Sequence, residues 1–322
     1  MQQTARTLPT SEHFELAQIA EGVYAAIGVA GGAAHSNAGV VDLGDDTLIF
    51  DTFMLPLAAE DLRAAAEHLT GRPATYVINS HAHSDHWCGN QVFSQATIIA
   101  THKTRDIMPE AIDYLKQFKK DPSALEKEIQ QDQERLETEP DPRWRTSLEV
   151  SIASRHRLLG LLPTLDFRFP NQTFEGKLVF HGTQRMVELL TLSNGHTPSD
   201  AYLVLPAEHI MFMGDLGFFG CQPFMAHCNP QVWTAQLEKM EESNIETFVP
   251  GHGPLGTKAE GALQRQYIAA LEELVAQVIK DDGSIEEVMR GSLPAPFDAW
   301  LNDGMARFEA NVWSSYERLS GE

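Results

Sequence analysis

The chain has 322 residues, 43% of them hydrophobic and 21% charged, which is enough apolar sequence for one large α/β domain with an insertion. Its 24 Lys and Arg residues against 45 Asp and Glu residues give a formal net charge of −21. Nucleic acids and anionic membranes attract basic surfaces, so this charge argues against both as partners. The three cysteines are too few for a disulfide framework, the first residues lack a secretory pattern, and no apolar run could span a membrane. We therefore expect a cytoplasmic protein.

The first half of the chain predicts strands, one helix and then a long helical segment. Short apolar runs between turn residues predict strands at 23–29, 37–43, 47–51 and 74–79. Apolar residues at helical spacing predict a helix at 57–69. The segment 103–162 is charged and helical in period, and its prolines predict breaks into about three helices, at Pro122, Pro140 and Pro142. Strand-like sequence resumes after it, so we interpret it as an insertion within a single domain, 1–322, that forms a lid or a homodimer surface.

The second half repeats the order of strands followed by helix. Further strands are predicted at 177–181, 185–192, 201–205, 210–213 and 247–249. A helix is expected at 231–241, and a C-terminal helical segment at about 258–322. Four side chains are expected to form the buried side of this tail: Trp300, Phe308, Val312 and Trp313. Two strand-rich halves that each end in helix favour two packed sheets with helices on both outer faces.

Four side chains that can bind a metal ion lie within six residues: His81, His83, Asp85 and His86. They directly follow the predicted strand at 74–79, a position where functional sites are commonly built. In an extended stretch the first three of these side chains point to one side and the fourth to the other, an arrangement that suits two neighbouring ions. Imidazole nitrogens bind zinc, copper, iron or nickel, and the carboxylate adds a harder oxygen ligand.

Three more candidate ligands, His196, Asp215 and His252, each stand at the exit of a predicted strand. Each has an ordinary explanation when it is considered alone, as a turn residue, a helix cap or a loop residue. Together they supply the ligands that the first cluster lacks, so the sequence predicts one site built from all seven side chains.

The order HxHxDH, His, Asp and Gly-His resembles the metallo-β-lactamase superfamily in its glyoxalase II-like dinuclear form, over most of 23–256. Asp51 in Ile-Phe-Asp-Thr resembles the first motif of that family, with Phe53 where the family often has glycine. The resemblance implies an α/β fold, the four-layer αββα sandwich. It implies a first metal held by His81, His83 and His196. It implies a second metal held by Asp85, His86 and His252, with Asp215 as the bridge. Asp51 would hydrogen-bond ligands and fix their orientation.

The function that this resemblance implies is hydrolysis of a small carbonyl compound, an ester, thioester, lactone or lactam. A hydroxide that bridges two zinc ions would attack the carbonyl, and iron or manganese are alternative metals. Asp85 is the expected catalytic residue, because it would orient the hydroxide and pass on the proton. Cys88 follows the cluster closely, but nothing in the sequence marks it as an activated thiolate.

Other activities of the same fold remain as alternatives. His83, where diiron flavoproteins have Glu, favours zinc. Asp215 and the absence of an export signal argue against a secreted β-lactamase, and Phe218 stands where lactonases of the superfamily commonly have Tyr. An enzyme with one iron ion, similar to persulfide dioxygenases, is the main alternative. A phosphodiesterase or nuclease ranks below it because of the negative charge, and a non-catalytic module is disfavoured by the complete ligand set.

The substrate pocket is expected next to the metals. The loop at 30–37 resembles the loop that overhangs the site in this fold, and His35 is a candidate substrate contact. Three aromatic residues that closely follow the bridging Asp are further candidates for the pocket lining: Phe218, Phe219 and Phe224.

Overall fold

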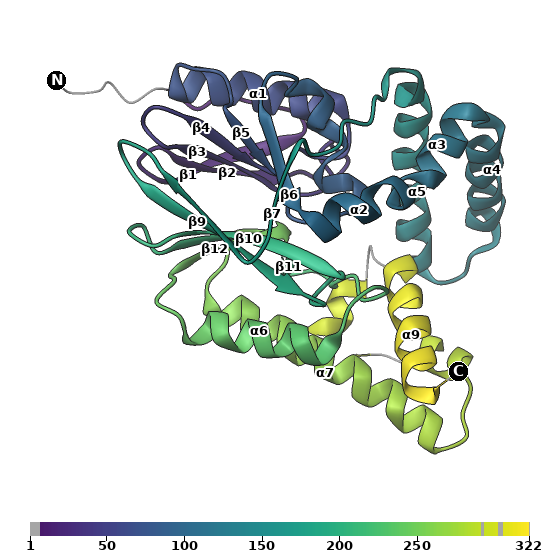
Figure 1. Ribbon diagram of the computed structural model, residues 1–322. Coiled ribbons are helices and arrows are strands. Elements are labelled where there is room, and N and C mark those ends of the chain that lie inside the picture. Colours follow the sequence, from purple (N-terminus) through teal and green to yellow (C-terminus); the bar gives the residue numbers. More distant parts are fainter. Residues whose placement is uncertain (1–6, 291–292, 302–304, 322) are drawn as a thin grey trace.

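The computed structural model describes residues 7–290, 293–301 and 305–321, and its strands form two sheets that face each other (Figure 1). The seven-stranded sheet has the order β1 (Phe14–Ala20), β2 (Val23–Gly28), β3 (Ala38–Asp42), β4 (Thr47–Phe50), β5 (Tyr76–Ile78), β6 (Thr97–Thr101) and β7 (Gln172–Phe174). The five-stranded sheet has the order β12 (Thr247–His252), β11 (Ile210–Phe218), β10 (Ser199–Leu205), β9 (Met186–Ser193) and β8 (Lys177–His181).

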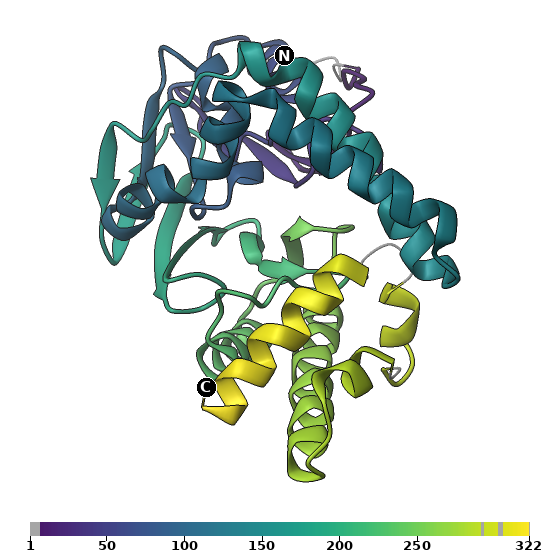
Figure 2. The ribbon, with the colours of Figure 1, turned by 90° about the vertical axis from the view of Figure 1, so that its right-hand side faces the viewer.

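Helices cover the outer faces of both sheets. Their bounds are α1 (Pro56–Thr70), α2 (His102–Ala111), α3 (Asp113–Lys120), α4 (Pro122–Thr138), α5 (Pro142–Leu161), α6 (Pro230–Glu242), α7 (Lys258–Lys280), α8 (Ile285–Arg290) and α9 (Met305–Ser320). In Figure 1, α1 lies over the seven-stranded sheet, whereas α6 and α7 lie under the five-stranded sheet. The insertion, α2 to α5, projects from one end of the sandwich, and α9 lies at the same end (Figures 1 and 2).

The hydrophobic core is divided among the three interfaces between these four layers. Leu62 and Ala66 of α1 pack with Ile49 and Val77 of the first sheet. Between the sheets, the rings of Phe50 and Phe212 lie 5.8 Å apart in a cluster of buried aliphatic side chains. On the far side, residues of α6, α7 and α9 pack against β11. Each interface removes a continuous apolar surface from water, so the predicted αββα sandwich is confirmed.

The insertion contains four helices where about three were predicted. Pro122 and Pro142 stand at the first positions of α4 and α5, where a missing N–H costs nothing, and Asp121 and Asp141 cap these helices. The additional break, between α2 and α3, falls at Ile112, which adopts a non-helical conformation. The nearest proline, Pro109, lies inside α2 three residues before this break, so the sequence pattern did not reveal its position.

Several strand bounds also differ from the prediction. Three strands, β1, β6 and β7, were not predicted. β1 and β7 have no clear alternation of apolar and polar residues, and β6 is a short apolar run directly before the insertion. β11 extends to Phe218 and β12 to His252, so Asp215 lies inside a strand rather than at its exit. Register shifts in the β11–β12 pairing beyond Phe212 let this irregular strand continue through the glycine-rich sequence.

The C-terminal tail is helical as expected, but one of its predicted core residues is not buried. Phe308 and Val312 are fully buried in α9, whereas 47% of the surface of Trp313 is exposed. Successive helical side chains point about 100° apart, so a residue next to Val312 leaves the buried face. The predicted single domain also includes 1–6, 291–292, 302–304 and 322, which lie outside the described residues. In the described part of the chain, no helix has the length and apolar character that crossing a membrane requires.

Candidate metal centre

The predicted site residues meet at one edge of the two sheets because of the strand directions. β4 and β5 are parallel, so Asp51 and His81, which follow them closely, lie at the same edge. β11 and β12 are also parallel, and they bring Asp215 beside His252. His196 lies in the turn between β9 and β10. Segments far apart in sequence therefore share one site.

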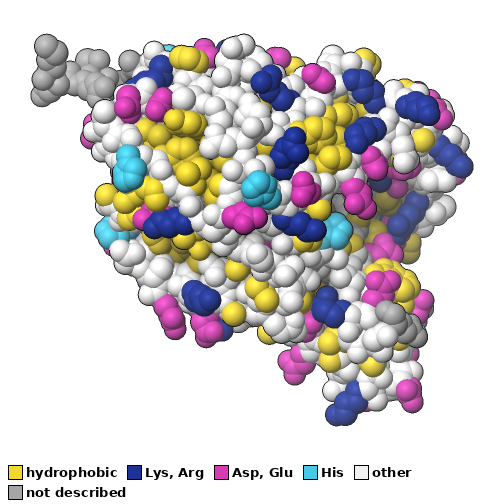
Figure 3. All heavy atoms as spheres, in the orientation of Figure 1, with side chains coloured by type: hydrophobic (Ala, Val, Ile, Leu, Met, Phe, Trp, Pro, Cys, Tyr) yellow, Lys and Arg dark blue, Asp and Glu magenta, His cyan; other side chains and the backbone are white. Residues whose placement is uncertain are grey.

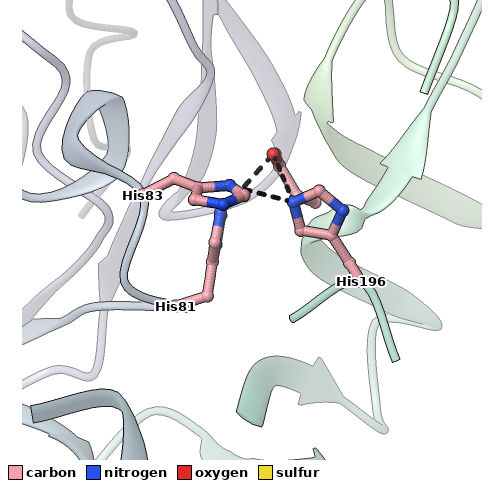
Figure 4. A group of neighbouring side chains, drawn as sticks. His81, His83 and His196 are labelled. Atoms are coloured by element: carbon pink, nitrogen blue, oxygen red, sulfur yellow. Dashed lines mark hydrogen bonds and ion pairs between the residues drawn. The ribbon is translucent and has the colours of Figure 1, made fainter. Parts of the chain in front are cut away.

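All seven predicted ligands lie together in two groups of donor atoms. The first group consists of His81, His83, His196 and Asp215, and the second of Asp85, His86 and His252. Within each group the donor atoms lie within 4.8 Å of one another. Figure 4 shows the imidazoles of His81, His83 and His196 pointing toward one another from two separate segments. The division matches the predicted first and second metal sites, while metal binding itself stays a prediction.

Asp215 contacts both groups, each with a different carboxylate oxygen. Its Oδ2 lies 3.5 Å from His81 Nε2 and 3.2 Å from His196 Nε2. Its Oδ1 lies 2.9 Å from His86 Nε2 and 3.3 Å from His252 Nε2. This is the position that a carboxylate bridging two ions would occupy.

Several of these donor atoms are buried without a hydrogen-bond partner. Among the described residues, the buried atoms in this state include His81 Nε2, His86 Nε2 and Asp215 Oδ1. A buried polar atom without a partner costs free energy, so such atoms are rare unless something else satisfies them. Imidazole nitrogens with a carboxylate oxygen are the donor set that zinc and iron bind. The residues present therefore fit a metal ion in each group.

Asp51 orients two of the imidazoles, one directly and one through Ser80. Asp51 Oδ2 lies 2.8 Å from His86 Nδ1 and accepts a hydrogen bond from Ser80 Oγ at 2.8 Å. Ser80 Oγ in turn lies 2.9 Å from His81 Nδ1. Since Ser80 donates to the carboxylate, it accepts from the Nδ1–H of His81. In their neutral form both imidazoles then carry their proton on Nδ1, which leaves each Nε2 lone pair free for a metal.

Burial and neighbouring charges move the pKa values of the cluster in opposite directions. Burial alone would raise the pKa of Asp215, but the imidazoles of His86 and His252 hold it well below 3.8. Although burial lowers the pKa of those two imidazoles, the carboxylates raise it above the usual value. Burial lowers the pKa of His83 well below 6.5 and that of His196 to about 4. The cluster thus balances an ionised carboxylate with protonated imidazoles, whose protons a metal ion would replace.

Two residues that sequence reasoning missed support the ligands. His83 Nδ1 faces His196, and its Nε2 lies 3.0 Å from Nδ1 of the exposed His227. Asp200 accepts hydrogen bonds from the backbone N–H of Thr197 at 3.1 Å and from its hydroxyl at 2.6 Å, and so holds the turn that carries His196. Burial raises the pKa of Asp200 to about 6. Asp200 stands four residues after His196, and this short spacing is a sequence feature that could have revealed its role. No sequence feature points to His227.

The loop expected to overhang the site is tied down at its C-terminal end. Ser36 Oγ donates to the backbone carbonyl of Asp85 at 2.6 Å. The side-chain amide of Asn37 donates to the carbonyls of Pro250 and Gly253 at 2.9 and 2.8 Å. These contacts attach the loop to both ligand-bearing segments and leave the preceding His35 exposed.

The candidate pocket residues lie at different depths. Phe218 is fully buried, and its ring stacks on that of His252 with 4.8 Å between the ring centroids, so it packs against a predicted ligand. Phe224 is partly buried, with its ring 5.6 Å from that of His83. Phe219 is 1% exposed in the core between β11 and the outer helices, which argues against contact with substrate. His35 lines a cavity beside the insertion.

Cys88 is not prepared for thiol chemistry. It is 1% exposed, and burial raises the pKa of its thiol well above the ordinary value. A thiol in this environment is not ionised at neutral pH, in agreement with the reading of the sequence.

A two-sheet sandwich with a His- and Asp-rich cluster at its edge defines a class of metal-binding proteins. The sequence profile of the metallo-beta-lactamase superfamily matches residues 31–252, and the chain belongs to this superfamily, most of whose members are metal-dependent hydrolases. The resemblance inferred from the motifs is thereby confirmed. Among curated proteins the sequence has no match.

Solved structures show the same fold. A metallo-beta-lactamase from Pontibacter korlensis is 14% identical, with a TM-score of 0.57 over 80% of this chain and 99% of that chain. FIM-1 from Pseudomonas aeruginosa, in its mono-zinc form, is 14% identical, with a TM-score of 0.56 over 82% of this chain and 98% of that chain. A metallo-beta-lactamase from Hirschia baltica is 15% identical, with a TM-score of 0.54 over 80% and 98%. Identities this low establish the fold alone.

Proposed function

We propose that the protein is a hydrolase that holds two zinc ions in the two donor groups and cleaves a small ester, thioester, lactone or lactam. The observation that carries this proposal is the placement of Asp215, whose two oxygens face different imidazole pairs. A single-metal site needs no such division. The proposed ligands are those of the two groups, with Asp215 as the bridge and Asp51 as the residue that orients them.

Bound zinc would lower the pKa of a water molecule to about 7 and polarise the substrate carbonyl. The protein's part is to orient the reactants and to move the proton. Asp85 suits proton transfer, because its side chain is 25% exposed, against 3% for Asp215, and its Oδ2 lies 3.3 Å from His252 Nε2. A proton from the attacking water can be accepted at the Asp85 carboxylate and released from there to solvent. The charge of His86 and a hydrogen bond from His252 lower the pKa of Asp85 against the effect of burial, so its carboxylate is ionised.

The alternatives receive less support. A mononuclear iron enzyme would leave the second group, with its buried His86 Nε2, unused. Lys and Arg side chains are interspersed with Asp and Glu on the face in Figure 3 and form no continuous basic surface there, so that face does not favour a nuclease. The small-molecule substrate and the cytoplasmic location remain part of the proposal.

The first test is metal analysis of the purified protein, combined with hydrolysis assays on thioesters, esters, lactones, β-lactams and phosphodiesters. We expect two zinc ions per chain and turnover of a carbonyl substrate. One iron ion per chain would reject the dinuclear proposal, and phosphodiester cleavage alone would reject the carbonyl substrate.

The second test is Asp215→Ala. Removal of the bridge should lower kcat by at least about 100-fold, an effect comparable to the loss of a major electrostatic contributor, and should reduce the zinc content below two per chain. Asp106→Asn, which changes an exposed carboxylate on α2, is the control. An unchanged rate in Asp215→Ala would contradict the role proposed for Asp215.

A further inference from the structure

A cavity of about 350 Å³ lies between the helical insertion and the body of the sandwich. Three residues of the body line one side: His35, Met54 and Leu55. Helices of the insertion line the other, and they include Tyr114, Phe118 and Leu158. The sandwich alone does not form this cavity, because seven of its ten lining residues come from the helices inserted between β6 and β7 of the first sheet. Its volume lies at the small end of the range found for ligand pockets.

The cavity walls are attached to the loop that carries Asp85. The hydroxyls of Tyr114 and Ser84 are 2.8 Å apart, and Ser84 immediately precedes Asp85. On the opposite wall, His35 is followed by Ser36, whose Oγ donates to the backbone carbonyl of Asp85. Both walls therefore contact the loop that carries the proposed catalytic carboxylate, while the seven proposed ligands themselves do not line the cavity.

The body side of the cavity is also held in place by backbone hydrogen bonds. The N–H groups of Met54 and Leu55 donate to the carbonyls of Ala34 and Ala33, at 3.0 and 3.3 Å. The two segments that form this wall therefore support each other. A preformed wall lowers the entropy cost of binding a ligand.

The lining of the cavity favours an uncharged apolar group. Five of its ten lining residues are apolar: Met54, Leu55, Phe118, Leu125 and Leu158. The cation among the lining residues is neutralised, because Arg155 Nε lies 3.3 Å from Glu128 Oε2 and a second contact joins the guanidinium to Asp132. A charged ligand would have to disrupt these ion pairs, whereas an aliphatic chain only displaces water.

We propose that this cavity binds the apolar acyl group of the substrate, so that the preferred ester or thioester has an unbranched acyl chain of about six to ten carbons. The length follows from the volume, which accommodates roughly a dozen non-hydrogen atoms at about 30 Å³ each. The proposal rests on the proposed function for the identity of the reaction. Binding of the chain itself requires no turnover.

Binding is measured by calorimetry with octanamide and acetamide, two uncharged carbonyl compounds that differ in chain length. We expect octanamide to bind the zinc-loaded protein at least tenfold more tightly than acetamide. Ser154 lines the cavity, with Oγ 3.4 Å from His35 Nε2, so Ser154→Trp should fill the space and remove this preference. The matched control is Ala153→Trp, on the exposed side of the same helix, which should keep it. Equal binding of the two amides, or an unchanged preference in a folded Ser154→Trp protein, would overturn the proposal.

A second variant keeps the proposal testable if Ser154→Trp does not fold. Leu158→Ala enlarges the cavity from a partly buried position, so it should shift the preferred ligand from octanamide toward dodecanamide. No shift would also count against the cavity as the acyl site.

The two proposals fail in different ways. A preference for octanamide that is lost in Ser154→Trp, with no hydrolysis of any ester, would reject the proposed function and retain the acyl site. Hydrolysis of 4-nitrophenyl acetate and octanoate with equal kcat/KM, and no preference in amide binding, would reject the acyl site and retain the hydrolase.

Discussion

Asp51 shows how much of the metal centre depends on one residue that contacts no substrate. Its carboxylate accepts hydrogen bonds from the backbone N–H and the hydroxyl of Ser80 and from His86, all at 2.8 Å. It adopts a positive φ of 60°, which is uncommon outside glycine, and the surrounding contacts hold it there. The unfavourable backbone conformation of Asp51 thus accompanies its role in orienting the ligands, as strained residues often do at functional sites.

The prediction at this scale is that Asp51→Asn weakens metal binding. An amide replaces one acceptor oxygen with a donor, so at least one of the three hydrogen bonds is lost and the imidazole orientation relaxes. We expect zinc affinity to fall by about 10- to 100-fold, the usual effect of losing a partner that orients ligands. The measurement is competition for zinc with a chromophoric chelator.

The exposed carboxylate of α2 again provides the control, because Asp106→Asn changes the net charge by the same amount. Equal zinc affinity of the Asp51→Asn and wild-type proteins would show that Asp51 does not orient the ligands.

At the scale of elements, two glycines in regular structure have opposite surroundings. Gly261 lies in α7, and a Cβ added there would meet only Glu241 Cγ, at 4.0 Å. Gly39 lies in β3, and a Cβ added there would overlap the ring of Phe212 in the facing sheet. The first glycine costs the helix conformational entropy, and the second allows the two sheets to approach closely.

The two positions therefore predict opposite effects of the same substitution. Gly261→Ala should raise the free energy of unfolding by about 0.5–1 kcal/mol, the difference in helix propensity. Gly39→Ala should lower it by about 1–3 kcal/mol, the usual cost of overpacking. Urea denaturation of both variants measures the change. A loss of stability in Gly261→Ala would mean that the space beside α7 is not open.

At the scale of the whole molecule, the metal centre joins the two halves of the sandwich. The HxHxDH segment follows β5 of the first sheet, whereas His196, Asp215 and His252 belong to the second sheet. Ions held between these segments would stabilise the contact between the sheets only when the protein is folded. Ligands that bind only the native state raise its stability by mass action.

Chelation should therefore lower the melting temperature. Free zinc at 100 times its dissociation constant adds about 2.7 kcal/mol per site. At roughly 2–4 °C per kcal/mol, two such sites raise the melting temperature by about 10–20 °C. Calorimetric scans with EDTA and with added zinc measure this difference. Asp215→Ala, which removes the bridge, should respond much less, and an equal response of both proteins would place the stabilising metal elsewhere.

The order of elements could be predicted from local patterns, and the exceptions have local causes. The helix around Leu62 and the buried strand before His81 are recognised by their periodicity and by the turn residues next to them. The break at Ile112 and the short edge strand β7 carry no such signal. Trp313 was assigned to the core although it neighbours Val312, whose direction on the helix differs by about 100°.

The amino-acid sequence alone determined which side chains are available for metal chemistry and in which order they follow the strands. These features are local, because a strand and the residue after it are neighbours in the chain. Only the tertiary structure decided how the groups divide between the two oxygens of Asp215, that Ser80 connects Asp51 to His81, and that Tyr114 of the insertion meets Ser84. Such contacts depend on how the two sheets and the inserted helices pack, and side chains brought together by packing share no spacing in the sequence.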